Sequence, residues 1–130
     1  MHKTIRVIDT EHAPKAVGPY SQAIAAGPFL FISGQLPIDP KVNKMTASTI
    51  KEQTKQVLNN IQAVLSAEGL SILNVVKTDV FLKDLQDFSD MNAVYAEYFS
   101  HAAKPARVTI QAAKLPLDCL VEISCIAYRG

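Results

Sequence analysis

The stretch PARVTIQAAKLPLDCLVEISCIAYR, residues 105–129, contains two segments with the alternating pattern of β-strands, and their pairing decides the fold. In the first segment, Val108 and Ile110 fit an inward apolar face. The opposite face carries three polar residues: Arg107, Thr109 and Gln111. The segment KLPLD separates the two strands, so the sequence predicts a hairpin that turns near Leu115-Pro116.

In such a hairpin, Thr109 lies roughly opposite Glu122. Arg107 and Glu122 then share one face as diagonal neighbours, about 7 Å apart at Cα. A slip of one residue in the register would place these two side chains on opposite faces.

Two helices are predicted upstream of this stretch. Residues 49–68 carry an apolar stripe at helical spacing, with Thr49 and Glu52 as a capping box and Gly69 as the C-terminal stop. Residues 87–100 carry a second stripe, and Asp84 or Asp87 is the expected N-cap. The second stripe consists of Phe88, Met91, Tyr95 and Tyr98.

Strands are predicted at residues 3–9 and 75–82, and a further hairpin turns at Gly27-Pro28. The resulting order predicts an α+β fold, with two helices packed on one face of a mostly antiparallel sheet. Residues 1–130 are expected to form a single domain, because the chain has ordinary domain length and lacks a linker or an internal repeat.

The composition narrows the classes of function. The net charge is +1 and the sequence has no basic cluster, which disfavours nucleic-acid binding. With 48% hydrophobic and 19% charged residues, the chain is globular and apolar enough to favour a surface buried against other chains. The three histidines, His2, His12 and His101, lack metal-ligand spacing, so they are predicted to be surface residues and no metal site is predicted.

Cytoplasmic localisation is the expectation, because the N-terminal segment lacks the apolar run of a signal peptide and no apolar run is long enough for a membrane span. The two cysteines, Cys119 and Cys125, are too far apart along a strand to pair with each other. They are predicted to be small buried residues in a reducing compartment.

Arg107 and Glu122 are the pair of residues best suited to bind a substrate and act on it chemically. A guanidinium binds a carboxylate through two parallel hydrogen bonds, and a neighbouring glutamate can hold a water molecule or move a proton. The pair therefore fits binding and hydration of a small acid. The alternative is an ordinary cross-strand ion pair on a solvated face.

Five motifs make the chain resemble the reactive intermediate deaminase (Rid, YjgF-like) family, and within it the RidA subgroup. They are AVGPYSQAI at 16–24, FISGQLPID at 31–39, QTKQVLNNIQAVLSAEG at 53–69, KTDVFLKDLQDFSDMNAVYAEYF at 77–99 and PARVTIQAAKLPLDCLVEI at 105–123. The resemblance runs nearly end to end.

This resemblance implies a chorismate-mutase-like fold and a homotrimer, with each cleft formed between two subunits. It also implies hydrolysis of 2-imino acids, such as 2-iminobutanoate and 2-iminopropanoate, to 2-keto acids and ammonia. Pyridoxal-phosphate enzymes release these imines, and the hydrolysis needs no metal or organic cofactor.

The resemblance also implies roles for individual residues. Arg107 would grip the substrate carboxylate, and Glu122 would act on the attacking water. The cleft would further contain Tyr20, Ser33, Gly34, Asn92 and Thr109.

Two departures from the family pattern stand out. Thr109 replaces a cysteine that many relatives carry, and we expect it to serve as cleft wall or through its backbone carbonyl. The segment LPLDC replaces a turn in which many relatives have a glycine or another turn residue.

Two other functions stay open. One is a translation-inhibiting ribonuclease, which the near-neutral charge and the scattered histidines disfavour. The other is a non-enzymatic module that senses small metabolites or binds partners through the same cleft, which would need Arg107 but not Glu122.

Overall fold

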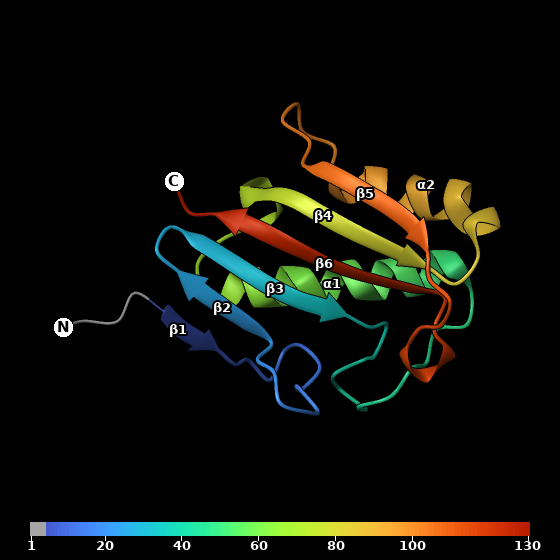
Figure 1. Cartoon of the computed structure of the whole chain (residues 1–130), viewed down its shortest axis with the longest axis horizontal. Coiled ribbons are helices and arrows are strands. Elements are labelled where there is room, and N and C mark those ends of the chain that lie inside the picture. The colour runs from blue at the N-terminus through green and yellow to red at the C-terminus, as the bar shows by residue number, and fades with distance from the viewer. Residues whose placement is uncertain (1–4) are drawn as a thin grey trace.

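The computed structural model describes residues 5–130, in which a six-stranded sheet carries two long helices on one face (Figure 1). The strands are β1 (Ile5–Ile8), β2 (Ala23–Ala26), β3 (Phe29–Gln35), β4 (Val75–Leu82), β5 (Ala106–Gln111) and β6 (Val121–Tyr128). The helices are α1 (Ile50–Ala67) and α2 (Phe88–Tyr98), and three short 3-10 turns are η1 (Ile72–Asn74), η2 (Leu85–Asp87) and η3 (Pro116–Asp118). His2 and the first two residues of the predicted strand at 3–9 lie outside the described residues.

The strand order is β1-β2-β3-β6-β4-β5, and every neighbouring pair is antiparallel except β4 and β5. The predicted α+β fold with a mostly antiparallel sheet is therefore confirmed. The homotrimer stays a prediction.

Helix α1 forms where its local signals predict it. Thr49 accepts a hydrogen bond from the backbone N–H of Glu52, and the Glu52 side chain accepts one from the Thr49 N–H, which completes the capping box. Gly69 ends the helix with a φ of +69°, a conformation that favours glycine. The apolar stripe of α1 packs into the core between the helices and the sheet.

The second helix, at 11 residues, is three residues shorter than the predicted range of 87–100. Asp84 caps the turn η2, where its side chain accepts a hydrogen bond from the Gln86 N–H, and Asp87 at the start of α2 makes no capping bond. Met91 and Tyr95 are buried as predicted, whereas Phe88 is partly exposed. No helix within residues 5–130 is long and apolar enough to cross a membrane.

The predicted hairpin between the last two strands is wrong. Strand β6 pairs with β3 and β4, and β5 pairs in parallel with the far edge of β4, so β4 separates the two strands. The register aligns Arg107 with Thr78 and Cys125, and Glu122 with Phe81 and Ile110. Arg107 and Glu122 are consequently not diagonal neighbours.

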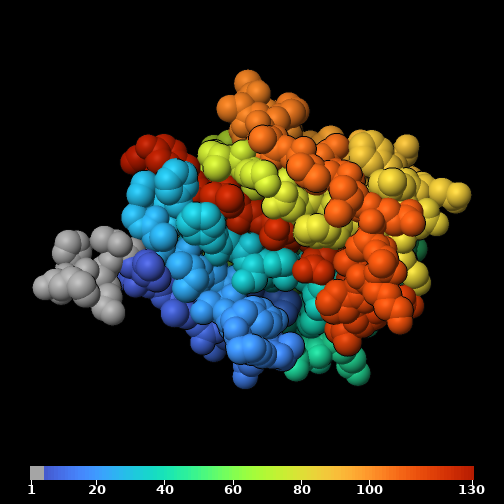
Figure 2. All heavy atoms as spheres, in the orientation of Figure 1, coloured from blue at the N-terminus to red at the C-terminus, as the bar shows by residue number. Residues whose placement is uncertain are grey.

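The predicted inward face of β5 is wrong as well. We call the sheet face covered by α1 and α2 the helix face, and the other the open face, which the space-filling view shows without a covering helix (Figure 2). Val108 and Ile110 lie on the open face and are 48% and 45% exposed. Other large apolar side chains exposed on this face include Phe29, Phe31 and Tyr128.

The connection from β5 to β6 contains an unusual turn. Leu117 and Asp118 have φ values of +56° and +54°, in the region that glycine favours. The LPLDC turn thus places two residues other than glycine in this region. Cys119 follows the turn and precedes β6, and both Cys119 and Cys125 are buried free thiols, as predicted.

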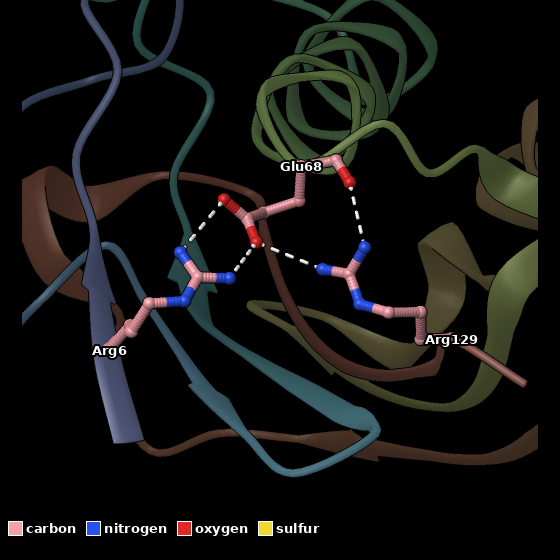
Figure 3. A network of polar contacts seen from close by, with 3 residues as sticks. All are labelled: Arg6, Glu68 and Arg129. Atoms are coloured by element: carbon pink, nitrogen blue, oxygen red, sulfur yellow. Dashed lines mark hydrogen bonds and ion pairs between the residues drawn. The ribbon is translucent and has the colours of Figure 1, made fainter. Parts of the chain in front are cut away.

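A polar network joins segments from both ends of the chain to the end of α1 (Figure 3). The Glu68 carboxylate accepts hydrogen bonds from Arg6 Nη2 at 2.6 Å and from Arg129 Nη2 at 2.9 Å. Arg129 Nη1 also donates to the Glu68 backbone oxygen at 3.1 Å. The hydrogen bonds from both arginines hold the pKa of Glu68 below its usual range.

Glu68→Gln is expected to lower the melting temperature at pH 7 by a few degrees, because two guanidinium groups lose their shared anion. A carboxyl with a depressed pKa stabilises the fold fully above its unfolded pKa of about 4.3, and that contribution is lost as the pH falls further. The difference between wild type and variant should therefore shrink in acid. Thermal melts between pH 7 and pH 3 measure it, with Glu97→Gln on α2 as the control. A constant difference across this range would contradict the assignment.

Candidate active site

Arg107 is held against α2 by three side chains. Its Nη1 donates to Asn92 Oδ1 at 2.7 Å, and its Cζ lies 4.7 Å from the ring centroid of Tyr95 and 5.5 Å from that of Phe88. The three residues lie at spacings of four and three along α2, so they share one face of the helix. A cation over an aromatic face is electrostatically attracted to it. The guanidinium is therefore fixed in place on the helix face.

Arg107 also borders a depression of about 500 Å³ beside the start of β5. Its wall includes Asn92, Tyr95, Phe99, Lys104 and Pro105. Within the described residues, Arg107 takes part in no ion pair, and Asn92 is its only hydrogen-bond acceptor. The remaining guanidinium N–H groups can therefore bind a carboxylate.

Glu122 lies on the open face, directly over Gly34. A Cβ atom at residue 34 would overlap Glu122 Oε2 and would lie 2.9 Å from its Cδ, so any larger residue would displace the carboxylate. The β3–β6 register shifts between Ile32 and Gln35, which marks a bulge at Ser33-Gly34. The bulge and the missing side chain together make the space that Glu122 occupies.

Glu122 is partly buried, and its surroundings are largely apolar. A depression of about 480 Å³ is lined by Glu122 together with Val17, Tyr20, Ser33, Leu36 and Pro116. Burial raises the pKa of the Glu122 carboxyl. Within residues 5–130, Glu122 takes part in no ion pair, which distinguishes it from Glu68. A carboxylate with a raised pKa and no cationic partner is a suitable base for a proton of bound water.

The two polar groups predicted beside Glu122 already have partners. Tyr20 Oη accepts a hydrogen bond from the Val17 N–H at 3.3 Å, and Ser33 Oγ donates to the Ser21 carbonyl at 2.6 Å. Both residues line the depression, and Tyr20 is half exposed. They shape its wall and hold the loop before β2.

Arg107 and Glu122 lie on opposite faces of the sheet. Arg107 contacts α2, whereas Glu122 alternates with Val121 and Ile123, which are buried on the helix face. Along the sheet they are three residues and two strands apart, which corresponds to about 14 Å between Cα atoms. One small acid cannot reach both groups in a single chain. The ion pair considered from the sequence is excluded by the same geometry.

Thr109 shares the helix face with Arg107 but lines neither depression. Its Oγ1 is buried and has no hydrogen-bond partner within residues 5–130. His101 differs from the expected surface histidine, because its Nε2 is also buried without a partner among the described residues, whereas His12 is exposed.

Neither cysteine fits a nucleophile, because burial raises the pKa of Cys119 to about 11 and that of Cys125 to about 12. Both thiols are therefore protonated at neutral pH. No group of three or more His, Cys, Asp or Glu side chains within residues 5–130 is arranged to hold a metal ion.

The two aromatic contacts of Arg107 are not predicted by the sequence pattern. Phe88 and Tyr95 fit the core stripe of the second helix, and their spacing alone gives no link to the arginine. The signal that would have found them is the combined spacing of Phe88, Asn92 and Tyr95 on a helix that covers the face of Arg107.

Residues 10–129 match the protein-family model described as Endoribonuclease L-PSP. The chain is 58% identical to a RutC family protein of Pyrococcus horikoshii, over 95% of this chain and 97% of the relative. It is 43% identical to the 2-iminobutanoate/2-iminopropanoate deaminase of Salmonella typhimurium, over 95% and 98% of the two chains. The crystal structure of the YjgF gene product from Escherichia coli superposes with a TM-score of 0.91 at 42% identity, covering 96% of this chain and 99% of that one. The chain belongs to the reactive intermediate deaminase (Rid, YjgF-like) family, as its motifs predicted.

Proposed function

We propose that the protein is a homotrimeric hydrolase that converts 2-imino acids, such as 2-iminobutanoate and 2-iminopropanoate, to 2-keto acids and ammonia. The observation that carries the proposal is a pair of charged groups that form no ion pair within residues 5–130: Arg107, which keeps free donors, and Glu122, which lies over Gly34 and has a pKa raised by burial. The name of the 43% identical relative supports the same reaction.

The reaction needs few groups. Arg107 binds the carboxylate and fixes the imine carbon relative to a water molecule. Glu122 takes one proton from the water as its oxygen bonds to that carbon, and passes this proton to the nitrogen. Glu122 then transfers the remaining hydroxyl proton to the nitrogen as the carbon–nitrogen bond breaks, so that ammonia leaves and the keto acid remains. No covalent enzyme intermediate is required, which agrees with two buried, protonated cysteines.

The distance between Arg107 and Glu122 supports assembly of the site from two subunits. A 2-imino acid is far smaller than the separation of about 14 Å within one chain, so Arg107 of one subunit would act with Glu122 of another. The exposed apolar side chains of the open face supply a surface for such contact.

The alternative from another class of function is a non-enzymatic module that binds a small metabolite and does not convert it. A sensing module would need Arg107, but it would gain nothing from a partly buried, unpaired carboxylate, which is costly to maintain. A ribonuclease is the second candidate, because the matching family model carries that description. No histidine among residues 5–130 lines the Arg107 depression or the Glu122 depression, and the net charge is +1. A coupled assay tests the proposal. A threonine dehydratase generates 2-iminobutanoate, semicarbazide traps it, and the protein should lower the amount of trapped product. RNA cleavage is measured in parallel.

The assembly is tested by light scattering. We expect about three times the monomer mass of 14.2 kDa at micromolar concentration. Phe31→Asp places a charge on the open face and should dissociate the trimer and abolish hydrolysis together. Leu73→Asp, which changes an exposed apolar residue outside the sheet, serves as the control. A fully active monomer would refute the shared site.

Glu122→Gln should lower kcat by about 10² to 10⁴, because the amide cannot accept the proton. Its melting temperature at pH 7 should be unchanged or higher, because a partly buried charge without a cation is removed. Gly34→Ala should cause a similar loss of activity. It keeps the Glu122 carboxylate, but the added Cβ pushes that carboxylate out of its position.

The pH dependence provides a second measurement of Glu122. Since burial raises its pKa, the acid limb of the kcat profile should lie above the usual glutamate pKa of about 4.3. Unchanged turnover in Glu122→Gln would favour the sensing module.

Arg107→Lys should lower kcat/KM by about 10² or more. Charge-assisted hydrogen bonds contribute about 1.5–3 kcal/mol each, and lysine cannot reproduce the two-pronged geometry of the guanidinium. The variant should remain trimeric. Arg129→Lys is the matched control, because Arg129 belongs to the Glu68 network and not to the site. Near-normal hydrolysis by folded Arg107→Lys would refute carboxylate binding by this residue.

A further inference from the structure

A buried hydrogen bond lies directly behind the Arg107 guanidinium. The hydroxyls of Thr78 and Tyr95 are 2.7 Å apart, Thr78 is fully buried and Tyr95 is 7% exposed. Thr78 is also the β4 residue aligned with Arg107 in the sheet. The strand beside the arginine and the helix over it are thus connected at the position of the arginine itself.

The ring of Tyr95 is a platform for the guanidinium. The distance of 4.7 Å from Arg107 Cζ to the ring centroid is within the range of a cation–π contact, and Phe88 provides a second ring at 5.5 Å. Tyr95 also packs against Phe99 with ring centroids 4.5 Å apart, which restricts the movement of the tyrosine ring. Its hydroxyl is held by Thr78, so both ends of the tyrosine side chain are fixed.

Apart from the two rings, one hydrogen bond restrains the orientation of the arginine. Its one hydrogen bond to a described residue is the bond from Nη1 to Asn92 Oδ1, which restrains one corner of the group. A single hydrogen bond permits rotation about its axis, whereas a ring beneath the guanidinium sets the plane of the whole fork. A carboxylate needs that plane, because two parallel hydrogen bonds form only when both groups are coplanar.

We propose that Tyr95 and Thr78 are positioning residues for the anion-binding arginine: the Tyr95 ring sets the plane of the Arg107 guanidinium, and Thr78 holds the ring in place. The inference rests on the proposed role of Arg107 in binding a carboxylate. It does not require that the bound acid be hydrolysed.

The first test is calorimetric binding of 2-oxobutanoate, a stable carboxylate of the expected product class, to the assembled protein. Tyr95→Leu should weaken binding about tenfold, as expected for loss of a partly buried cation–π contact. Tyr95→Phe keeps the ring and should recover most of the affinity. Thr78→Val should cause a small loss in the wild-type background, and no further loss in Tyr95→Phe, where the hydroxyl partner is already absent.

A double-mutant cycle separates positioning from general packing. If Tyr95 acts through Arg107, Tyr95→Leu should change 2-oxobutanoate affinity less than twofold in an Arg107→Lys background. Tyr98→Leu is the matched control: it lies on the same helix, and its hydroxyl donates to Asn59 on α1 instead. Equal losses in both arginine and lysine backgrounds, or an equal loss from Tyr98→Leu, would overturn the proposal.

A spectroscopic readout covers the case in which Arg107→Lys binds too weakly to measure. Protons above an aromatic face resonate upfield, so the side-chain Nε–H proton of Arg107 should shift downfield in Tyr95→Leu. It should keep its position in Tyr95→Phe and Tyr98→Leu. An unshifted Arg107 signal in Tyr95→Leu would overturn the proposal irrespective of binding.

The two proposals fail in different ways. If the wild-type protein does not suppress trapping of 2-iminobutanoate, the proposed hydrolysis is refuted, while the Arg107 signal and 2-oxobutanoate binding still test the positioning role of Tyr95. If hydrolysis is normal and unaffected by Tyr95→Leu, the positioning role is refuted and the proposed function is retained.

Discussion

The parallel pairing of β4 with β5 is the constraint on which the arrangement of the site depends. Parallel neighbours cannot be joined by a tight turn and need a crossover, which η2 and α2 provide. The crossover packs on the helix face, toward which Arg107 points. The same connection that carries the chain to the sheet edge therefore brings Phe88, Asn92 and Tyr95 to the arginine.

Strand β6 is last in the chain but central in the sheet, between β3 and β4. Its position brings Glu122 next to the bulge at Ser33-Gly34 on the open face. An arginine in contact with Glu122 would lower its pKa, but the pKa is raised by burial. Separation of the two groups within one chain thus leaves Arg107 without an anionic partner and Glu122 without a cationic one among residues 5–130.

The sequence predicted best what local interactions determine. The capping box of α1, its terminal glycine and the hairpin at Gly27-Pro28 depend on residues close in the chain, and all three are confirmed. The pairing of β5 failed because it depends on a distant strand. Consecutive strands usually lie side by side, so the sequence favoured a hairpin that β4 in fact interrupts.

The candidate site was predicted in its residues but not in its geometry. The family motifs identified Arg107, Glu122 and Gly34, whereas alternation alone placed the two charged groups on one face. The rings beside Arg107 belong to α2, which lies 9 to 19 residues upstream in the chain. A hairpin between the last two strands does not predict that α2 packs over Arg107. Correct topology was therefore needed before the motif residues could be assigned an environment.

The apolar residues of β5 show why the alternation rule failed on this sheet. The rule equates an apolar face with the core, but both faces of this sheet carry large apolar side chains: those on the helix face pack in the core, and Val108 and Ile110 lie on the open face. A sheet with two apolar faces requires two covers, and the chain supplies helices for only one of them within residues 5–130. Covering the open face with further copies of the chain would account for the high hydrophobic content. It would also bring an arginine and a glutamate from different subunits within reach of one small acid.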